Sequence, residues 1–142
     1  MWAIKIGTGH KTSTARNAPV KPVAMLAIAE GLASLGIRST ADPREAAKDP
    51  DRLADAEEVW TKAVGQGSGI TWRYGLMLAG VDGVKPDRMI KRFVADALGM
   101  NWKKMTALFA QSAVIEAAAA LHLTATALDH AIWSWQRVPR RG

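Results

Sequence analysis

Gly65-Gln66-Gly67-Ser68-Gly69 is the stretch of sequence that decides the predicted fold. Glycine adopts positive φ values at little cost, so three glycines at alternate positions favour a tight turn over a continued helix. Apolar residues at helical spacing precede this stretch over residues 50–64 and follow it over residues 70–79. The pattern therefore predicts two helices joined by a glycine-rich turn.

The rest of the chain also predicts helices, whose ends are marked by proline, glycine and capping residues. Pro22 and Gly36 bound one helix over 22–35, a short helix falls within 39–48, and Asp49 caps the helix that starts at Pro50. Further helices are predicted over residues 86–98, 101–121 with a break near Thr106, and 126–137. We therefore expect an all-α, compact multi-helix bundle.

Thr126 and Asp129 have the spacing of a capping box, which predicts that Thr126 caps the last helix. Near the other end of the chain, residues 2–6 favour one short strand.

Length and composition predict one domain over residues 1–142. The chain has 142 residues, of which 49% are hydrophobic and 23% charged, as is ordinary for a globular domain. We expect a loop or short-strand arm over 1–21, a helical core over 22–137 that contains the turn at 65–69, and a flexible basic tail over 138–142.

The charge and the missing cysteines restrict the classes of partner and cofactor. The net charge of +6 is typical of proteins that bind DNA or RNA, although a basic protein without such a partner is the alternative. The lack of cysteine excludes disulfides and thiolate metal sites and favours a cytoplasmic protein. The three histidines lack metal-ligand spacing, so no metal and no cofactor are expected. No apolar run predicts a membrane span, and the oligomeric state stays open.

The glycine-rich turn has the properties of an anion site. Its backbone N–H groups and the positive end of the following helix point in one direction, as suits a DNA phosphate. The amides would come from Gly65, Gly67, Gly69 and Ile70. The alternative is a simple link between two packed helices.

Two stretches downstream carry a family resemblance. Gly67-Ser68-Gly69-Ile70-Thr71-Trp72-Arg73-Tyr74-Gly75-Leu76-Met77-Leu78-Ala79-Gly80 is followed by Val84-Lys85-Pro86-Asp87-Arg88-Met89-Ile90-Lys91-Arg92-Phe93. Over about residues 50–100 this resembles the helix-hairpin-helix base-excision DNA glycosylase superfamily, in which a Gly-x-Gly hairpin precedes a helix, a short loop and an Asp that opens the next helix. The resemblance implies that the hairpin grips the DNA backbone and that Asp87 is catalytic.

The implied chemistry is cleavage of an N-glycosidic bond in DNA. A carboxylate at Asp87 would stabilise the cationic sugar of an extruded nucleotide. The basic residues around it would hold phosphates, and they are Arg73, Lys85, Arg88, Lys91 and Arg92. Family members with lyase activity carry a lysine where Thr71 stands, so a monofunctional glycosylase is expected. The alternative for Asp87 is a helix cap without a catalytic role.

A second function class is consistent with the same residues. About 64 residues precede the hairpin, fewer than the helical half that the family places there, so the chain resembles a truncated relative. The alternative function is therefore a non-catalytic helical module for protein interaction or regulation that retains the fold. Four tryptophans are candidates for stacking on bases or for packing in the core, and they are Trp60, Trp72, Trp133 and Trp135.

Overall fold

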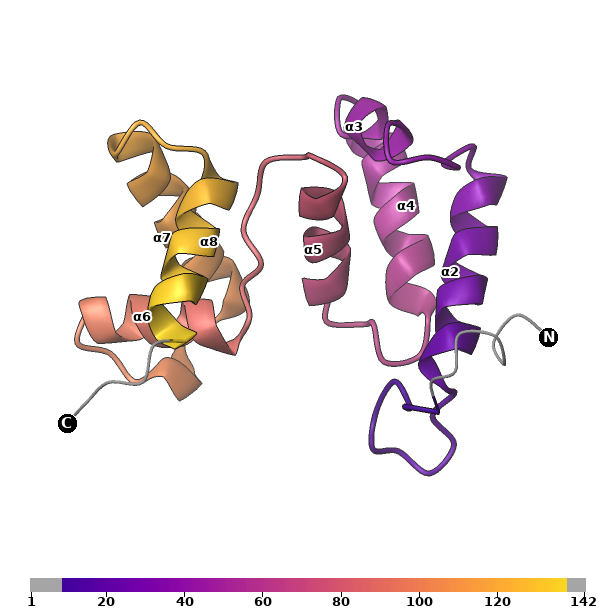
Figure 1. The fold of residues 1–142 in the computed structure, drawn as a ribbon, viewed down its shortest axis with the longest axis horizontal. Coiled ribbons are helices and arrows are strands. Elements are labelled where there is room, and N and C mark those ends of the chain that lie inside the picture. Colours follow the sequence, from indigo (N-terminus) through magenta and orange to yellow (C-terminus); the bar gives the residue numbers. More distant parts are fainter. Residues whose placement is uncertain (1–8, 138–142) are drawn as a thin grey trace. The chain divides into compact units, whose positions relative to one another are not determined.

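The computed structural model describes residues 9–137, and these form an all-helical structure (Figure 1). The described helices are α2 (Lys21–Ser34), α3 (Asp42–Ala46), α4 (Pro50–Lys62), α5 (Ile70–Leu78), α6 (Arg88–Ala97), the 3₁₀ helix η1 (Trp102–Lys104), α7 (Ala107–Ala120) and α8 (Ala125–Arg137). Within residues 9–137 there is no strand, only an isolated bridge between Lys11 and Val20. The all-α prediction is confirmed, while the predicted strand over 2–6 and the tail over 138–142 lie outside the described residues.

The chain divides into two compact units. Unit 1 contains the residues up to Trp72 together with 79–81, and unit 2 contains 73–78 together with the residues from Asp82 onward. Helix α5 therefore begins in unit 1 and contributes most of its residues to unit 2. The single domain over 1–142 stays a prediction.

Unit 1 is built on the packing of α2 against α4. A Cβ atom added to Gly31 of α2 would lie 2.5 Å from the Cγ1 atom of Val59 of α4, so glycine is the residue that permits this packing. Ile28 and Ala56 are buried on the two helices. The indole of Trp60 meets that of the buried Trp72 with ring centroids 5.5 Å apart, which brings the start of α5 into the same core.

Unit 2 has a separate apolar core formed by α6, α7 and α8, each of which packs against the other two (Figure 1). Buried side chains recur at helical spacing on all three helices. The core cluster comprises Val84, Ile90, Val94, Ala95, Met105, Ala110, Val114, Ala118, Ala125 and Ile132.

A set of hydrogen bonds joins residues 82–85 to the first turns of α8, and we call it the α8 clasp. The carboxylate of Asp82 accepts from the N–H groups of Ala125 (3.1 Å) and Thr126 (2.8 Å). The N–H of Gly83 donates to Thr126 Oγ1 (3.1 Å), and the N–H of Lys85 donates to Asp129 Oδ1 (2.9 Å). The two bonds to Asp82 satisfy free amides at the start of α8, and the other two satisfy the amides of Gly83 and Lys85, in each case with a group more than 40 residues away.

The capping box predicted for Thr126 and Asp129 is wrong. Helix α8 begins at Ala125, and the side chain of Thr124 accepts from the N–H of Ala127 (3.1 Å). The N–H of Thr126 is taken by Asp82, and Asp129 accepts from Lys85. At Thr126 the long-range clasp replaces the predicted local cap because Asp82 supplies a charged acceptor, which binds an amide more strongly than a hydroxyl does.

Most of the other predicted helix ends lie within two residues of the observed ones, although α6 begins at Arg88 and not at Pro86, and α4 ends at Lys62 and not at Val64. The side chains of Asp49, Asp87 and Thr106 accept from backbone N–H groups at the starts of α4, α6 and α7. Gly36 and Gly99 have φ values of 75° and 64° just after helices, which is the conformation of a glycine C-cap. The break predicted near Thr106 is confirmed, since η1 and α7 are separate helices.

No single helix between residues 9 and 137 is long and apolar enough to cross a membrane. Helices α7 and α8 reach that length only as a pair, and the chain bends by 110° between them.

Candidate functional site

A pocket of about 410 Å³ opens in unit 2, and Asp87 lies in its wall. Its residues come from α5, from the segment leading into α6 and from α8. They are Tyr74, Met77, Leu78, Lys85, Asp87, Ile90, Thr126, Asp129, His130 and Trp133. The volume is within the range of about 300–1,000 Å³ that small-molecule sites occupy.

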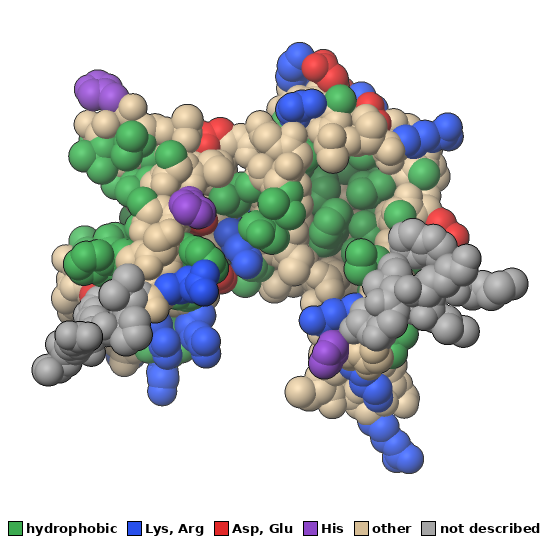
Figure 2. All heavy atoms as spheres, viewed as in Figure 1, with side chains coloured by type: hydrophobic (Ala, Val, Ile, Leu, Met, Phe, Trp, Pro, Cys, Tyr) green, Lys and Arg blue, Asp and Glu red, His purple; other side chains and the backbone are tan. Residues whose placement is uncertain are grey.

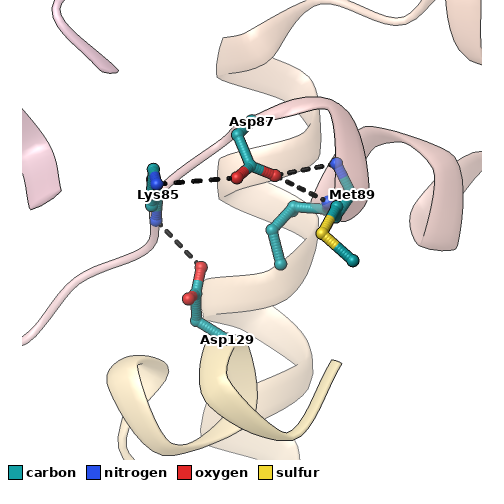
Figure 3. Close-up of polar contacts among 5 residues, drawn as sticks. Lys85, Asp87, Met89 and Asp129 are labelled. Atoms are coloured by element: carbon teal, nitrogen blue, oxygen red, sulfur yellow. Dashed lines mark hydrogen bonds and ion pairs between the residues drawn. The ribbon is translucent and has the colours of Figure 1, made fainter. Parts of the chain in front are cut away.

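Asp87 both caps α6 and faces the pocket (Figure 3). Its Oδ1 atom accepts from the N–H groups of Met89 (2.7 Å) and Ile90 (3.3 Å). Its Oδ2 atom lies 3.7 Å from the ammonium nitrogen of Lys85, and both side chains are about three-quarters buried. One oxygen is therefore committed to the helix, and the other remains near a cation at the pocket.

Asp129 is a second carboxyl group in the same pocket, and sequence analysis missed this role. The residue is 9% exposed, and its Oδ1 atom accepts from the backbone N–H of Lys85, whereas Asp87 contacts the ammonium of the same lysine (Figure 3). Burial raises the pKa of the Asp129 carboxyl, and the nearby Asp87 carboxylate raises it further, against the lowering effect of the Lys85 N–H, the Lys85 ammonium and His130. The signal in the sequence was an acidic residue on the apolar stripe of Ala125 and Ile132.

Aromatic side chains form walls of the pocket. The Lys85 ammonium lies 4.4 Å from the centre of the Tyr74 ring, which keeps the ammonium at the pocket. The rings of His130 and Trp133 are 6.1 Å apart, and the guanidinium of Arg137 stacks 4.3 Å from the Trp133 ring. Such walls suit a planar ligand, because flat rings stack on aromatic faces.

Most of the net positive charge belongs to unit 2. Its sequence contains ten Lys and Arg and five Asp and Glu, a net charge of +5, whereas unit 1 has nine and eight, a net charge of +1. Lys and Arg side chains gather where α6 begins (Figure 2). We use the name basic face for the Lys and Arg residues of α6 and of η1, two elements in contact, and these are Arg88, Lys91, Arg92, Lys103 and Lys104. Arg92 stacks on Trp102 of η1 at 4.8 Å, which fixes the two elements together.

The hairpin at 65–69 has the predicted turn conformation, but its groove is acidic. Gly65 and Gly69 have φ values of 87° and 68°, and the Gly69 N–H donates to the carbonyl of Gln66 (3.0 Å). Glu57 and Glu58 line the groove beside Gly67–Gly69. Glu57 Oε1 lies 3.4 Å from the position of a Cβ on Gly69. The Glu57 carboxylate at this distance opposes a phosphate, while Glu58 is paired with Lys62 (2.6 Å), so the groove is electrostatically less suited to DNA than the basic face.

Replacing Gly65 by Ala is expected to destabilise unit 1 by about 2 kcal/mol, because it combines a left-handed backbone conformation with a steric overlap. The new Cβ would lie 2.9 Å from Thr12 Cβ and 3.0 Å from the Thr12 carbonyl oxygen. Gly67→Ala is the matched control, because its Cβ would meet only the Thr61 carbonyl at 3.8 Å. Urea unfolding measures both, and equal stability of the two variants would show that Gly65 is not required by the turn.

The residues predicted to bind DNA divide between the two units. Gly65, Gly67, Gly69 and Ile70 belong to unit 1, and Arg73, Lys85, Asp87, Arg88, Lys91 and Arg92 belong to unit 2. The structure brings Lys85 and Asp87 together at the pocket. The binding and catalytic roles of all these residues stay predictions. In the part of the chain from 9 to 137, no three His, Asp or Glu side chains form a candidate metal site.

One family model, described as a domain of unknown function (DUF8548), matches residues 1–137. No curated protein matches the chain. No solved structure matches it either.

Proposed function

The chain belongs to the DUF8548 family, whose description assigns no activity, and we propose from the site itself that the protein is a cytoplasmic DNA-binding protein with a pocket for one extruded base. One observation carries this proposal: the Asp87 carboxylate lies in a pocket with aromatic walls, in the unit that carries a net charge of +5. Flipped bases are held by stacking between aromatic or apolar side chains and by hydrogen bonds to their edges. The resemblance to helix-hairpin-helix glycosylases supports the same conclusion.

The proposed reaction is hydrolysis of the bond between the sugar and the base. As this bond breaks, positive charge develops on the sugar ring, and the Asp87 carboxylate stabilises it. The oxygen of a water molecule bonds to the anomeric carbon, one proton of the water ends on the departing base, and free base and an abasic sugar result. Because Thr71 replaces the lyase lysine, water and not an amine is the nucleophile.

Affinity for DNA is proposed to come from the basic face of unit 2. Binding to phosphates releases counterions, so the affinity should fall steeply as salt increases. The double variant Arg88→Glu/Lys91→Glu should weaken binding and reduce the slope of log affinity against log salt by about 2, or one per phosphate contact. Arg92 is left intact because it packs on Trp102. Titration of a labelled duplex at several salt concentrations measures these effects.

Lys21→Glu/Arg38→Glu is the matched control, since it makes the same charge change at exposed residues of unit 1. It should retain most of the affinity and the original slope. Equal losses in the two double variants would contradict a specific basic face, and no duplex binding at low salt would contradict the proposed function.

The non-catalytic interaction module also has an observation in its favour. Apolar side chains are exposed on and after α7, including Leu108, Phe109, Ile115, Leu121 and Leu123. If no DNA binds at low salt, this alternative becomes the better interpretation.

A further inference from the structure

The pocket carries two polar groups whose hydrogen-bonding capacity differs, Asp129 and Lys85. Asp129 contributes a carboxylate whose Oδ1 atom binds the Lys85 N–H, and no hydrogen bond to Oδ2 is formed by the described residues. The ammonium of Lys85 lies between the Tyr74 ring and the Asp87 carboxylate. The pocket therefore presents an acceptor at Asp129 and a donor at Lys85.

The two carboxyl groups have different surroundings, which separates their roles. Asp87 holds the start of α6 through Oδ1, while Asp129 lies on α8 and is 9% exposed. Figure 3 shows that they contact different nitrogens of Lys85, Asp87 the ammonium and Asp129 the backbone N–H. In the proposed function Asp87 stabilises the positive charge on the sugar. Asp129 and Lys85 are then the groups that can form hydrogen bonds to the base.

We propose that Asp129 determines the base specificity of the pocket, and that the pocket takes a base with a guanine-type edge. Such an edge places a ring N–H and an amino group next to each other, where one carboxylate can accept from both, and a carbonyl beside them for an ammonium. Thymine and uracil carry a carbonyl on each side of their ring N–H, so one carbonyl would meet the Asp129 carboxylate without a donor. Two acceptors that face each other in a buried site without a donor are costly, so such bases are rejected. This inference rests on the proposed function, because it names the base that the pocket holds.

The test uses three duplexes that differ only in one unpaired nucleotide, which carries guanine, hypoxanthine or thymine. Hypoxanthine lacks only the 2-amino group of guanine. Wild-type protein should bind the guanine duplex about tenfold more tightly than the hypoxanthine duplex, the usual effect of one hydrogen bond to a charged group. The thymine duplex should bind at least as weakly as the hypoxanthine duplex. Equal affinity for guanine and hypoxanthine in the wild type would overturn the inference without any variant.

Asp129→Asn removes the charge but keeps an oxygen for the Lys85 N–H. The ratio of guanine to hypoxanthine affinity should fall to about 2 or less, because the amide nitrogen repels the amino group. Ser134→Ala, at an exposed position of α8 outside the pocket, is the control and should keep the wild-type ratio. A purely structural role for Asp129 would lower all three affinities together and leave the ratio unchanged.

Titration with free guanosine and free inosine separates the two proposals. The backbone amide signals of Lys85 and Asp129 report occupancy of the pocket in an NMR titration. Salt-dependent DNA binding without preference for guanine overturns this inference alone. A preference for guanosine over inosine without DNA binding supports the inference and overturns the proposed function. No binding of either nucleoside or of DNA overturns both.

Discussion

Asp87→Asn is expected to lower the rate of base release from DNA by about 100-fold or more, because an amide cannot stabilise positive charge on the sugar. The fold should survive, because Asn is as good an N-cap as Asp and its Oδ1 can still accept from Met89 and Ile90. Single-turnover assays with duplexes that each carry one damaged or mismatched base measure release. Urea unfolding of the same preparations measures stability.

Two further variants separate the charge of Asp87 from its role as a cap. Asp87→Ala should lose activity to the same extent and should also lose about 1 kcal/mol of stability, the usual cost of removing an N-cap. Thr106→Ala removes the cap of α7, whose Phe109 N–H bond is 3.1 Å long, and should cost similar stability with little loss of base release. If Asp87→Asn releases base as fast as the wild type, Asp87 is a helix cap only.

The helix boundaries could be predicted because their signals are local. Asp49 and Asp87 occupy cap positions, and their side chains accept from amides two and three residues away. Gly36 and Gly99 end helices because their own φ values are positive. Each of these choices depends on the residue and its immediate neighbours, which a single sequence displays.

The pocket could not be predicted because its residues meet only in the fold. Lys85 and Asp129 are 44 residues apart, and Tyr74 comes from another helix. The spacing of Thr126 and Asp129 predicted a local cap, but both side chains form hydrogen bonds with the backbone of residues 82–85 instead. The Thr126 N–H could have been satisfied by a local cap or by a distant group, and it donates to the charged carboxylate of Asp82.

The conformation of the hairpin could be predicted from the sequence, but its electrostatics could not. Its conformation follows from Gly65 and Gly69, which have positive φ values as expected. Its electrostatics depend on Glu57 and Glu58 of α4, which line the same groove. The net charge of +6 was visible in the sequence, but its concentration in unit 2 emerged only with the division of the chain.

Asp82→Ala is expected to lower the free energy of unfolding of unit 2 by about 2 kcal/mol, because it leaves two amides at the start of α8 without their charged acceptor. The lost bonds are those from Ala125 (3.1 Å) and Thr126 (2.8 Å). Urea unfolding followed through the amide signals of unit 2 measures the change. Asp55→Ala removes an exposed carboxylate of α4 and should alter stability by less than about 0.5 kcal/mol.

The effect of Asp82→Ala should depend on pH. The Thr126 N–H, aided by that of Ala125, holds the pKa of the Asp82 carboxyl below its ordinary value. The folded state thus releases this proton more readily than the unfolded state. The contribution of Asp82 is complete above the unfolded pKa of about 4 and is lost as the pH falls through the lower folded pKa. The stability difference between wild type and Asp82→Ala should therefore shrink below about pH 4.

In the Asp82→Ala variant, the contribution of Asp129 to the free energy of unfolding should decrease as the pH rises, which is opposite to the effect of Asp82 in the wild type. Burial raises the pKa of Asp129, so the folded state binds this proton more tightly than the unfolded state does. Its contribution is present below the unfolded pKa and is lost as the pH rises through the folded pKa. The double variant Asp82→Ala/Asp129→Asn should lose this dependence, whereas Asp82→Ala alone should keep it.

A stability difference between wild type and Asp82→Ala that stays constant from pH 6 to pH 3 would show that the Asp82 carboxylate does not hold α8 in place.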